Sequence, residues 1–342
     1  LYQTREKYAE YLKIDEKEIG LIGDNVFEVD KKITIISVPT FRSRIVFKSY
    51  GKILLKQPEL KPLVINTNLL IMDEAHRVGK NSFYQCSIIF KNAPYRFAMS
   101  ATPWSRSDQL GIMLQAAYGP SIAKVGADVL MKMGIIAIPK IIVYSTNSEQ
   151  LNPALRWQEA YSEGIVENGK RNRIIIELIK KHLDRNILVL FERKNHGKLL
   201  SAMLSEEQIP HELVWGDVEA TDRSSVRERF NKGELKVIIG SRIFETGIDL
   251  PELNVLIRAD GFKAEAKVIQ GAGRALRRTK SKQNALIYDF YDSHQKHLLR
   301  HSKSRIATYE EYYKNIEIQK IDYDTGKHFV INTRRRKNAR NY

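Results

Sequence analysis

Short apolar runs of strand length are the feature of this sequence that most restricts its fold. Several are rich in Val and Ile and barely alternate with polar residues. This pattern is typical of strands buried on both faces, as in a parallel sheet covered by helices. We expect strands at Ile33–Val38, Leu69–Met72, Arg96–Met99, Lys140–Tyr144, Ile187–Phe191, Glu212–Trp215, Lys236–Ile239, Asn254–Ile257 and Ala285–Tyr288.

Helical patterns separate these runs. They span Thr4–Leu12, Arg171–His182, Lys194–Leu204, Ser224–Phe230 and Ala266–Leu276. Strands that alternate with helices predict the α/β class with open parallel sheets. A chain of 342 residues is too long for one ordinary core, so we expect more than one domain. The expected parts are a first domain at 1–145, a second at 146–300, and a C-terminal helical extension with a basic tail at 301–342.

Composition narrows the possible functions. The chain is 43% hydrophobic and 28% charged, which is typical of a globular protein. No run approaches about 18 uncharged apolar residues, so we expect no membrane span. Cys86 is the single cysteine, which excludes a disulfide framework and a cysteine-based zinc site and fits a reducing cytoplasm. The net charge of +16 favours a polyanionic partner, most simply nucleic acid.

Two adjacent acids, Asp73 and Glu74, directly follow the expected strand Leu69–Met72. Ligand chemistry in open α/β sheets takes place at the carboxyl ends of strands. There Asp73 can hold a Mg²⁺ that bridges nucleotide phosphates, and Glu74 can orient or deprotonate the water that attacks the γ-phosphate. The alternative is an ordinary acidic helix cap, because acidic residues favour helix N-termini. A histidine such as His76, taken alone, is more often structural than functional.

Small hydroxyl residues end the next expected strand. Ser100-Ala101-Thr102-Pro103 follows Arg96–Met99. Its hydroxyl groups can hydrogen-bond across a gap between domains, although a routine turn would have the same sequence. Trp104, just beyond, can stack on a base or pack under its own loop.

Two later segments indicate phosphate chemistry. In Gln270–Arg277 (QGAGRALR), Arg274 and Arg277 project from one helix face, where guanidinium groups can contact phosphate oxygens bidentately. A solvated arginine pair is the alternative. Ile239–Pro251 contains Gly247 and Asp249, which suggest a tight loop with a carboxylate at its rim. A plain β-turn is the alternative there.

The order DEAH, SATP, TGIDLP and QGAGRALR resembles motifs II, III, V and VI of superfamily 2 helicases. Tyr161–Asn172 (YSEGIVENGKRN) and Ala285–Asp292 (ALIYDFYD) look most similar to the branch that contains bacteriophage UvsW-type and XPB-like branch-migration helicases. The resemblance covers nearly the whole chain. It implies two RecA-like domains with parallel sheets, with ATP and Mg²⁺ bound between the two lobes.

The resemblance also implies an activity and a setting. The activity is that of an ATP-dependent DNA helicase or translocase that remodels single-stranded, forked or branched DNA. The setting is DNA replication, recombination or repair, alongside other proteins of these processes. The compartment is the cytoplasm, which for a bacteriophage protein is that of the host.

Individual residues take roles from this resemblance. Arg274 and Arg277 become arginine fingers that act in catalysis with Asp73 and Glu74. The residues implied to bind the nucleotide are Asp73, Glu74, His76, Gly247, Asp249, Gln270, Arg274 and Arg277. Those implied to couple hydrolysis to motion are Ser100 and Thr102. Those implied to contact nucleic acid are Thr40, Trp104, Arg106, Arg242, Arg334, Arg335 and Arg336.

Motif I of the family is a phosphate-binding loop that ends in Gly-Lys-Thr or Gly-Lys-Ser, and this sequence does not contain it. Gly79-Lys80-Asn81-Ser82 lacks the register and follows motif II. We therefore expect the chain to begin inside an N-terminally incomplete first domain, and not to hydrolyse ATP alone. Two alternatives stay open, a nucleic-acid-binding module without ATPase activity and the motor subunit of a restriction enzyme. An RNA substrate is also open.

Nucleic-acid binding should weaken steeply as salt rises, because phosphate contacts release counterions. Removal of Arg334–Arg340 should lower the affinity without abolishing motor activity. Each single-strand phosphate contact that is lost should reduce the slope of log K against log[salt] by about 0.7. Fluorescence anisotropy of a labelled oligonucleotide across a salt series measures both quantities. A flat salt dependence would contradict the predicted basic binding surface.

Overall fold

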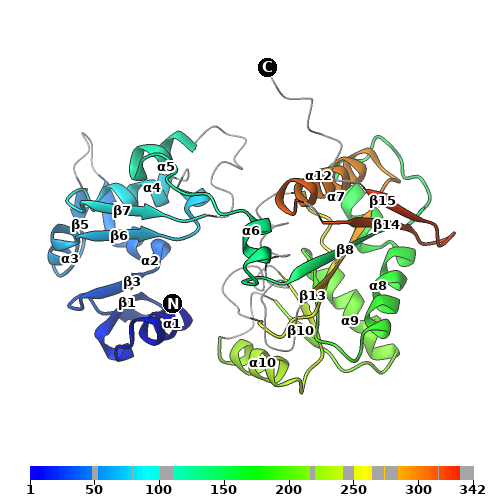
Figure 1. Ribbon diagram of the computed structural model, residues 1–342, viewed down its shortest axis with the longest axis horizontal. Coiled ribbons are helices and arrows are strands. Elements are labelled where there is room, and N and C mark those ends of the chain that lie inside the picture. The colour runs from blue at the N-terminus through cyan, green and yellow to red at the C-terminus, as the bar shows by residue number, and fades with distance from the viewer. Residues whose placement is uncertain are drawn as a thin grey trace. The chain divides into compact units, whose positions relative to one another are not determined.

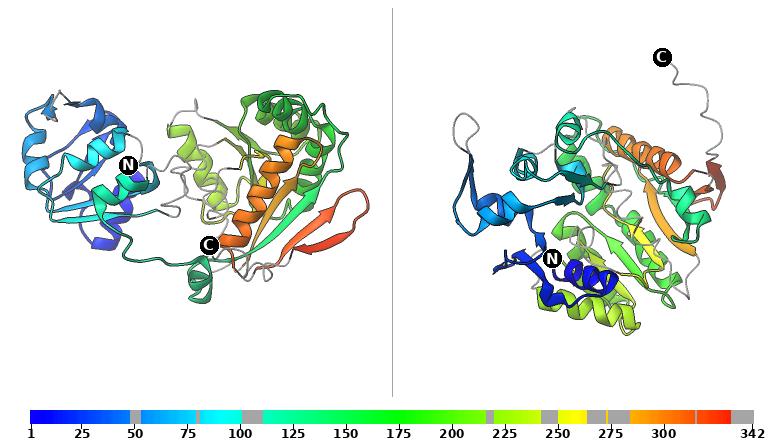
Figure 2. Two further views of the ribbon diagram at one scale, coloured as in Figure 1. Left: turned by 90° about the horizontal axis from the view of Figure 1, so that it is seen from above. Right: turned by 60° about the vertical axis from the view of Figure 1, so that its left-hand side comes forward.

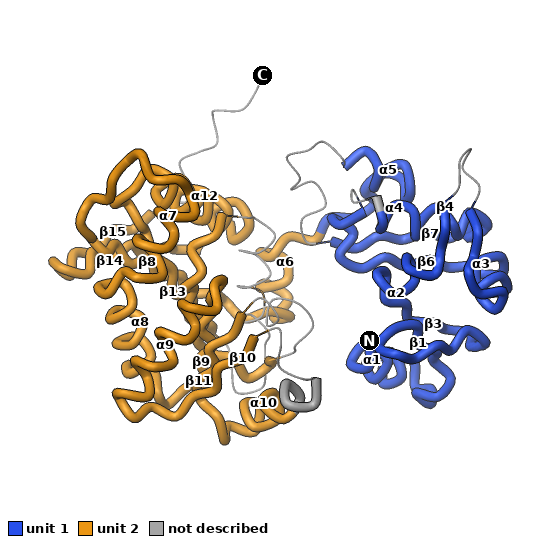
Figure 3. Tube along the Cα trace, turned by 180° about the vertical axis from the view of Figure 1, so that it is seen from behind, with its two compact units in different colours: residues 1–124 blue, residues 125–342 orange. Residues whose placement is uncertain are grey.

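The computed structural model describes residues 1–47, 53–78, 81–100, 111–215, 220–241, 250–263, 273, 284–314 and 316–331. The chain divides into two compact units, Leu1–Lys124 and Val125–Tyr342, coloured separately in Figure 3. The division precedes the boundary that the sequence suggests at residue 145. The reason is strand β8 (Ile138–Ser145), which pairs with strands of unit 2 on both of its edges.

Unit 2 is built on a sheet with the strand order β10-β11-β9-β12-β13-β8-β14-β15 (Figure 1). Neighbouring strands run parallel, except that β15 is antiparallel to β14. Besides β8, the strands are β9 (Ile187–Leu190), β10 (Glu212–Val214), β11 (Val237–Gly240), β12 (Val255–Arg258), β13 (Asn284–Tyr291), β14 (Ile318–Asp322) and β15 (His328–Ile331). The predicted α/β class with a largely parallel sheet is confirmed.

Helices cover both faces of this sheet (Figure 2). The described helical segments are α6 (Ala127–Lys132), α7 (Trp157–Tyr161), the π-helical turn η4 (Ser162–Val166), α8 (Gly169–Lys181), α9 (Lys194–Glu206), α10 (Ala220–Lys232) and α12 (Lys296–Tyr312). In β9, Leu188 and Leu190 enter a core with α6, α10 and α12, whereas Ile187 and Val189 enter a core with α8 and α9. Burial on both faces explains the unbroken apolar runs.

The end of the described chain belongs to unit 2. After α12, the hairpin β14–β15 extends the sheet beyond β8. Lys170 of α8 pairs with Asp324 at 2.6 Å, and the Tyr323 hydroxyl donates to Glu177 at 2.6 Å. Residues 301–331 therefore combine a helix with a sheet hairpin, where the sequence suggests a helical extension. The basic tail lies outside the described residues.

Unit 1 carries smaller sheets. Its described helical segments are α1 (Tyr2–Leu12), η1 (Glu16–Glu18), α2 (Val38–Ser43), α3 (Leu60–Asn66), η3 (Ala75–Arg77), α4 (Asn81–Ile88) and α5 (Gly111–Tyr118). Its described strands are β1 (Ile19–Gly23), β2 (Val26–Phe27), β3 (Ile33–Ile36), β4 (Ile45–Phe47), β5 (Ile53–Leu55), β6 (Leu69–Met72) and β7 (Tyr95–Ala98). Among these residues the sheets are β2-β1-β3, β4-β5 and the parallel pair β6-β7.

The β6–β7 pair is packed on one face. Met72 and Ala98 face a core that includes Leu114 and Ala117 of α5. In the described part of unit 1, the opposite face exposes the side chains of Leu69, Ile71, Tyr95 and Phe97. The two strand ends that carry the predicted acid and hydroxyl residues are therefore fixed from the side of α5.

Cys86 lies in the larger core of unit 1, near Phe41 and Phe90. Burial raises the pKa of its thiol to about 11, so the thiol stays protonated at neutral pH. A buried, protonated thiol is a weak nucleophile. Cys86 is therefore a packing residue.

Gly197 should resist replacement. It lies in α9 against the Phe191 ring, and a Cβ atom there would lie 2.6–2.8 Å from three ring carbons. Gly197→Ala should therefore destabilise unit 2 by about 1–3 kcal/mol through overpacking. An alanine inside a helix would otherwise stabilise by about 0.5–1 kcal/mol. Thermal unfolding followed by circular dichroism measures the change.

Gly169→Ala is the matched control. Gly169 is the first residue of α8, and a Cβ atom there meets nothing within 4 Å. The Tm of the Gly169→Ala variant should stay unchanged or rise. If Gly197→Ala also keeps its Tm, the close packing of Gly197 on Phe191 is wrong.

Candidate functional site

The acid pair lies where β6 ends. Asp73 is exposed and Glu74 is half-buried. The backbone ties this point to the end of β7, because Met99 N donates to Met72 O and Ala75 N donates to Met99 O, each at 2.9 Å. The carboxyl ends of two parallel strands therefore bring the acid pair beside the start of the predicted Ser-Ala-Thr-Pro segment.

Glu74 has an unusual backbone. Its φ of 50° and ψ of 44° place it in the left-handed region, where residues with a Cβ are disfavoured by about 1–2 kcal/mol. The Glu74 N–H donates to Asp73 Oδ1 at 2.8 Å, which holds the two carboxylate-bearing residues in a sharp turn. Strained backbone of this kind is concentrated at functional sites.

His76 connects the two strand ends. Its Nδ1 lies 3.2 Å from a carboxylate oxygen of Glu74 and 3.3 Å from the Ser100 hydroxyl. The His76 side chain is 17% exposed, so the contact is partly shielded from water. Three residues that the sequence singles out therefore converge. Their roles in binding and coupling stay predictions.

Thr40 lies in the first turns of α2, shortly after β3. Its hydroxyl donates to Ser37 Oγ at 3.3 Å, and its carbonyl accepts from Ser43 Oγ at 2.7 Å. The hydroxyl thus has a local partner at the carboxyl end of a strand. Its predicted contact with nucleic acid stays a prediction.

The other predicted site residues lie outside the described residues, and the structure does not place them. They are Thr102, Trp104, Arg106, Arg242, Gly247, Asp249, Gln270, Arg274, Arg277, Arg334, Arg335 and Arg336. In the described residues, no three His, Cys, Asp or Glu side chains gather into a metal-binding group. A magnesium ion that shares one protein carboxylate with nucleotide phosphates does not require such a group. The helices of the described chain also include none long and apolar enough to cross a bilayer.

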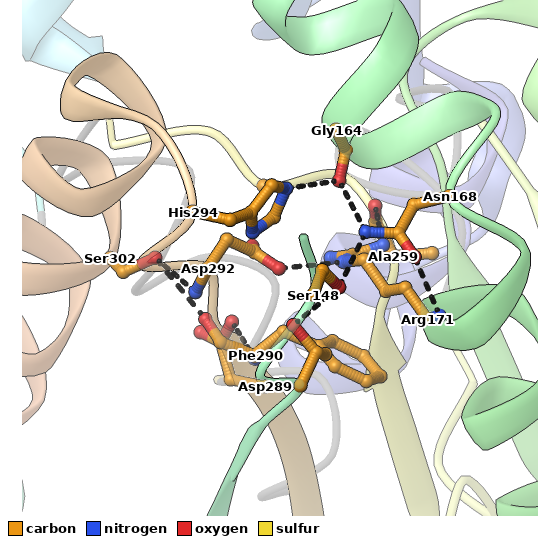
Figure 4. A network of polar contacts seen from close by, with 12 residues as sticks. Ser148, Gly164, Asn168, Arg171, Ala259, Asp289, Phe290, Asp292, His294 and Ser302 are labelled. Carbon is orange, nitrogen blue, oxygen red and sulfur yellow. Dashed lines mark hydrogen bonds and ion pairs between the residues drawn. The ribbon is translucent and has the colours of Figure 1, made fainter. Parts of the chain in front are cut away.

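Unit 2 contains buried ion pairs that the sequence analysis did not predict. Arg171 Nε donates to Asp292 Oδ1 at 3.1 Å, as Figure 4 shows, and Arg305 Nε donates to Asp289 Oδ1 at 3.0 Å. All four side chains are at most 2% exposed. The available signal was the pair of acids at the end of a strand predicted to be buried on both faces, because a buried carboxylate needs a cation.

Arg258 forms a third buried pair, at the end of β12. Its Nε and Nη2 donate to the Asp260 carboxylate at 3.1 and 2.6 Å. Burial alone would raise the pKa of Asp260, but the Arg258 guanidinium beside it holds that pKa below its usual value. Both groups are therefore ionised at neutral pH. The pair is a structural contact at the point where β12 ends and residues 259–263 begin.

A hollow of about 410 Å³ lies at the carboxyl ends of β8 and β13, lined in part by Ser148, Asn168, Lys170 and His294. Its polar groups contact one another, because Asn168 Nδ2 donates to Ser148 Oγ at 2.9 Å and to Gly164 O at 3.2 Å (Figure 4). Of the residues predicted to bind nucleotide or nucleic acid, those that the structure describes, Thr40, Asp73, Glu74 and His76, do not line it. We assign it no ligand.

Comparison with known proteins matches both units. Residues 1–105 match the family "Type III restriction enzyme, res subunit", and residues 170–279 match "Helicase conserved C-terminal domain". The ATP-dependent DNA helicase uvsW of Enterobacteria phage T4 is 26% identical over 278 residues, which are 75% of this chain and 55% of the phage protein. The DNA 3'-5' translocase XPB2 of Sulfurisphaera tokodaii is 22% identical over 83% of this chain and 68% of its own length.

A solved structure shares the fold. That of S. cerevisiae Dbp5 bound to RNA and ADP BeF3 superposes with a TM-score of 0.63 over 94% of this chain and 75% of Dbp5, at 16% identity. This chain spans about half the length of the first curated relatives that it matches. The two family matches, in this order on two α/β units, define the class: the chain belongs to the superfamily 2 helicases. Within them it is related to the UvsW and XPB proteins.

The left-handed backbone of Glu74 gives a stability test. Glu74→Gly should be more stable than Glu74→Ala by about 1 kcal/mol, because glycine adopts this conformation without a steric penalty. Both variants remove the same carboxylate, so its contact with His76 cancels from the comparison. The unit 1 transition in calorimetry measures the difference.

Glu6 is the control with the opposite expected sign. It is exposed in the interior of α1. There the glycine variant should be less stable than the alanine variant by about 1 kcal/mol. If the two positions show the same order of stability, Glu74 is not strained.

Proposed function

We propose that this chain is the motor region of an ATP-dependent DNA helicase or translocase that remodels forked or branched DNA. The observation that carries the proposal is the acid pair at the carboxyl end of a parallel strand. Glu74 is linked there through His76 to Ser100 at the end of the neighbouring strand. The order of the motifs and the membership of superfamily 2 support it.

The chemistry divides between the two acids. Asp73 is exposed and offers the carboxylate oxygens that Mg²⁺ prefers, so it fits as the ligand of a nucleotide-bound ion. Bound Mg²⁺ would neutralise charge on the β- and γ-phosphates. Glu74 orients the attacking water and accepts its proton, while His76 fixes the Glu74 carboxylate. Arg274 and Arg277 are proposed to stabilise the charge that develops on the γ-phosphate.

DNA is the proposed nucleic acid. The net charge of +16 suits a polyanion. The phage relative is described as an ATP-dependent DNA helicase and the archaeal one as a DNA translocase. We assign Ser100 and Thr102 to the coupling of hydrolysis to motion. The residues that we assign to DNA binding are Thr40, Trp104, Arg106, Arg242, Arg334, Arg335 and Arg336. We place the protein in recombination and repair of replicating DNA, in the cytoplasm of the cell or of the host of a bacteriophage.

The motor subunit of a restriction enzyme is the second candidate. The match of residues 1–105 to the type III res subunit family favours it. Both candidates predict translocation on DNA driven by ATP, and only the restriction enzyme also cuts DNA. Incubation of the full-length natural protein with ATP and plasmid DNA separates them, because cleavage products appear only in the second case.

Glu74→Gln tests the proposed chemistry in the full-length natural protein. The substitution keeps the size of the side chain and removes the base, so ATP turnover should fall by about 10²–10⁴-fold. Binding of ATP and of single-stranded DNA should stay unchanged. A coupled phosphate-release assay measures turnover, and anisotropy measures binding.

Glu59→Gln provides the control, since Glu59 is an exposed glutamate of unit 1 outside this site. It should keep full turnover. ATPase activity of Glu74→Gln within about threefold of the unsubstituted protein would remove Glu74 from this role. Unwinding assays on forked DNA, four-way junctions and duplex RNA then identify the substrate, and a preference for duplex RNA would overturn the DNA assignment.

A further inference from the structure

The chain that leaves β12 is held by side chains. Four consecutive backbone carbonyls, those of residues 258–261, accept hydrogen bonds from buried groups on other elements. Arg171 donates to Arg258 O at 3.5 Å and to Ala259 O at 3.0 Å. The Tyr161 hydroxyl donates to Asp260 O at 2.7 Å, and Arg305 Nη1 donates to Gly261 O at 2.7 Å.

Arg171 and Arg305 distribute their N–H donors in the same way between a carboxylate of the β13 region and the backbone that follows β12. In each, Nε donates to a carboxylate near the carboxyl end of β13: Arg171 to Asp292, which follows the strand, and Arg305 to Asp289, which lies within it shortly before its end. In each, Nη1 donates to the chain after β12, to Ala259 O and Gly261 O respectively. The remaining nitrogen of Arg305 donates to Phe290 O at 2.7 Å, and the Arg171 guanidinium stacks over the Phe290 ring at 4.2 Å. Each arginine thus joins the carboxyl ends of two neighbouring strands.

Stability alone does not explain this arrangement. Buried ion pairs lose most of their Coulomb attraction to desolvation, and apolar residues of similar volume are often equally stabilising. A guanidinium group adds a rigid planar fork that sets the position of several acceptors at once. The two arginines therefore fix the position of residues 258–261 more tightly than apolar packing would.

The position of residues 258–261 matters because of the sequence that follows them. The fixed backbone ends in Phe262 and Lys263, and the sequence continues into residues 264–283, which carry Gln270, Arg274 and Arg277. We propose that Arg171 and Arg305 are positioning residues for the reaction, and that they act by fixing residues 258–261, the described backbone that precedes the arginine-bearing segment in the sequence. This inference rests on the proposed ATPase function. A displacement of about 1 Å at a reacting group is enough to reduce a rate by about 10²-fold.

Lysine substitutions test the proposal. Arg171→Lys and Arg305→Lys keep the charge opposite Asp292 and Asp289, but a lysine cannot span both strands with a rigid fork. In the full-length natural protein, each should lower kcat for DNA-stimulated ATP hydrolysis by about 10- to 100-fold. The KM for ATP and the affinity for single-stranded DNA should change by less than about twofold. Hydrogen exchange should rise at residues 258–263 and not across the rest of the sheet.

Tyr288→Phe is the matched control. It removes a buried hydrogen bond of the same unit, the 2.7 Å contact between the Tyr288 hydroxyl and His182, and leaves residues 258–261 untouched. It should reduce the Tm and keep kcat. A lysine variant that keeps kcat, or whose exchange rises throughout unit 2, would overturn the positioning role. Failure of the unsubstituted protein to hydrolyse ATP would overturn the proposed function and this inference with it, whereas normal turnover in both lysine variants would overturn only the inference.

Discussion

Carboxylates at the ends of β12 and β13 lie inside unit 2, where an unpaired charge would be strongly disfavoured. Asp292 and Asp289 remain compatible with burial because Arg171 and Arg305 face them at 3.1 and 3.0 Å. The pairing brings α8, α12 and both strands to one point. Beyond this point, the two guanidinium groups hold the backbone of residues 258–261 through hydrogen bonds to its carbonyls.

Unit 1 also contains an arrangement that lowers the stability of the fold and fixes the position of a side chain. Glu74 keeps a left-handed backbone that glycine would adopt more readily. A hydrogen bond from its own N–H to Asp73 Oδ1 and one from the next residue, Ala75 N, to Met99 O hold it there. In both units, the costly arrangement lies at the carboxyl end of a parallel strand. The apolar cores of unit 2 lie along the strands themselves, away from these strand ends.

The sequence predicts the parts of this structure that depend on local pattern. The Val- and Ile-rich runs become β9, β11 and β12 because a strand buried on both faces has no polar positions. The acid pair lies at a strand end for the same local reason. The run Ile19–Gly23 was not predicted, although its strand is buried throughout, because two glycines interrupt its apolar pattern.

Other features depend on contacts between distant parts of the chain. The assignment of β8 to unit 2 follows from its pairing with β13 and β14, which no local pattern reveals. The hairpin β14–β15 has mixed polarity, so its strands become recognisable only beside β8. The sequence gives no sign that Arg171 is buried, because its partner Asp292 is distant along the chain and contacts it only in the folded structure.

The position of β8 has a consequence for the order in which unit 2 forms. β8 is the first strand of its sheet to be synthesised, yet both of its neighbours, β13 and β14, come from the last part of the described chain. During translation, β8 therefore waits without a partner while β9 to β12 emerge, and closing such a long loop slows folding. A nascent chain that stops before residue 284 offers β8 no strand to pair with. Unit 2 therefore completes its sheet only after residues 284–322 have been made, when its first strand pairs with β13 on one side and β14 on the other.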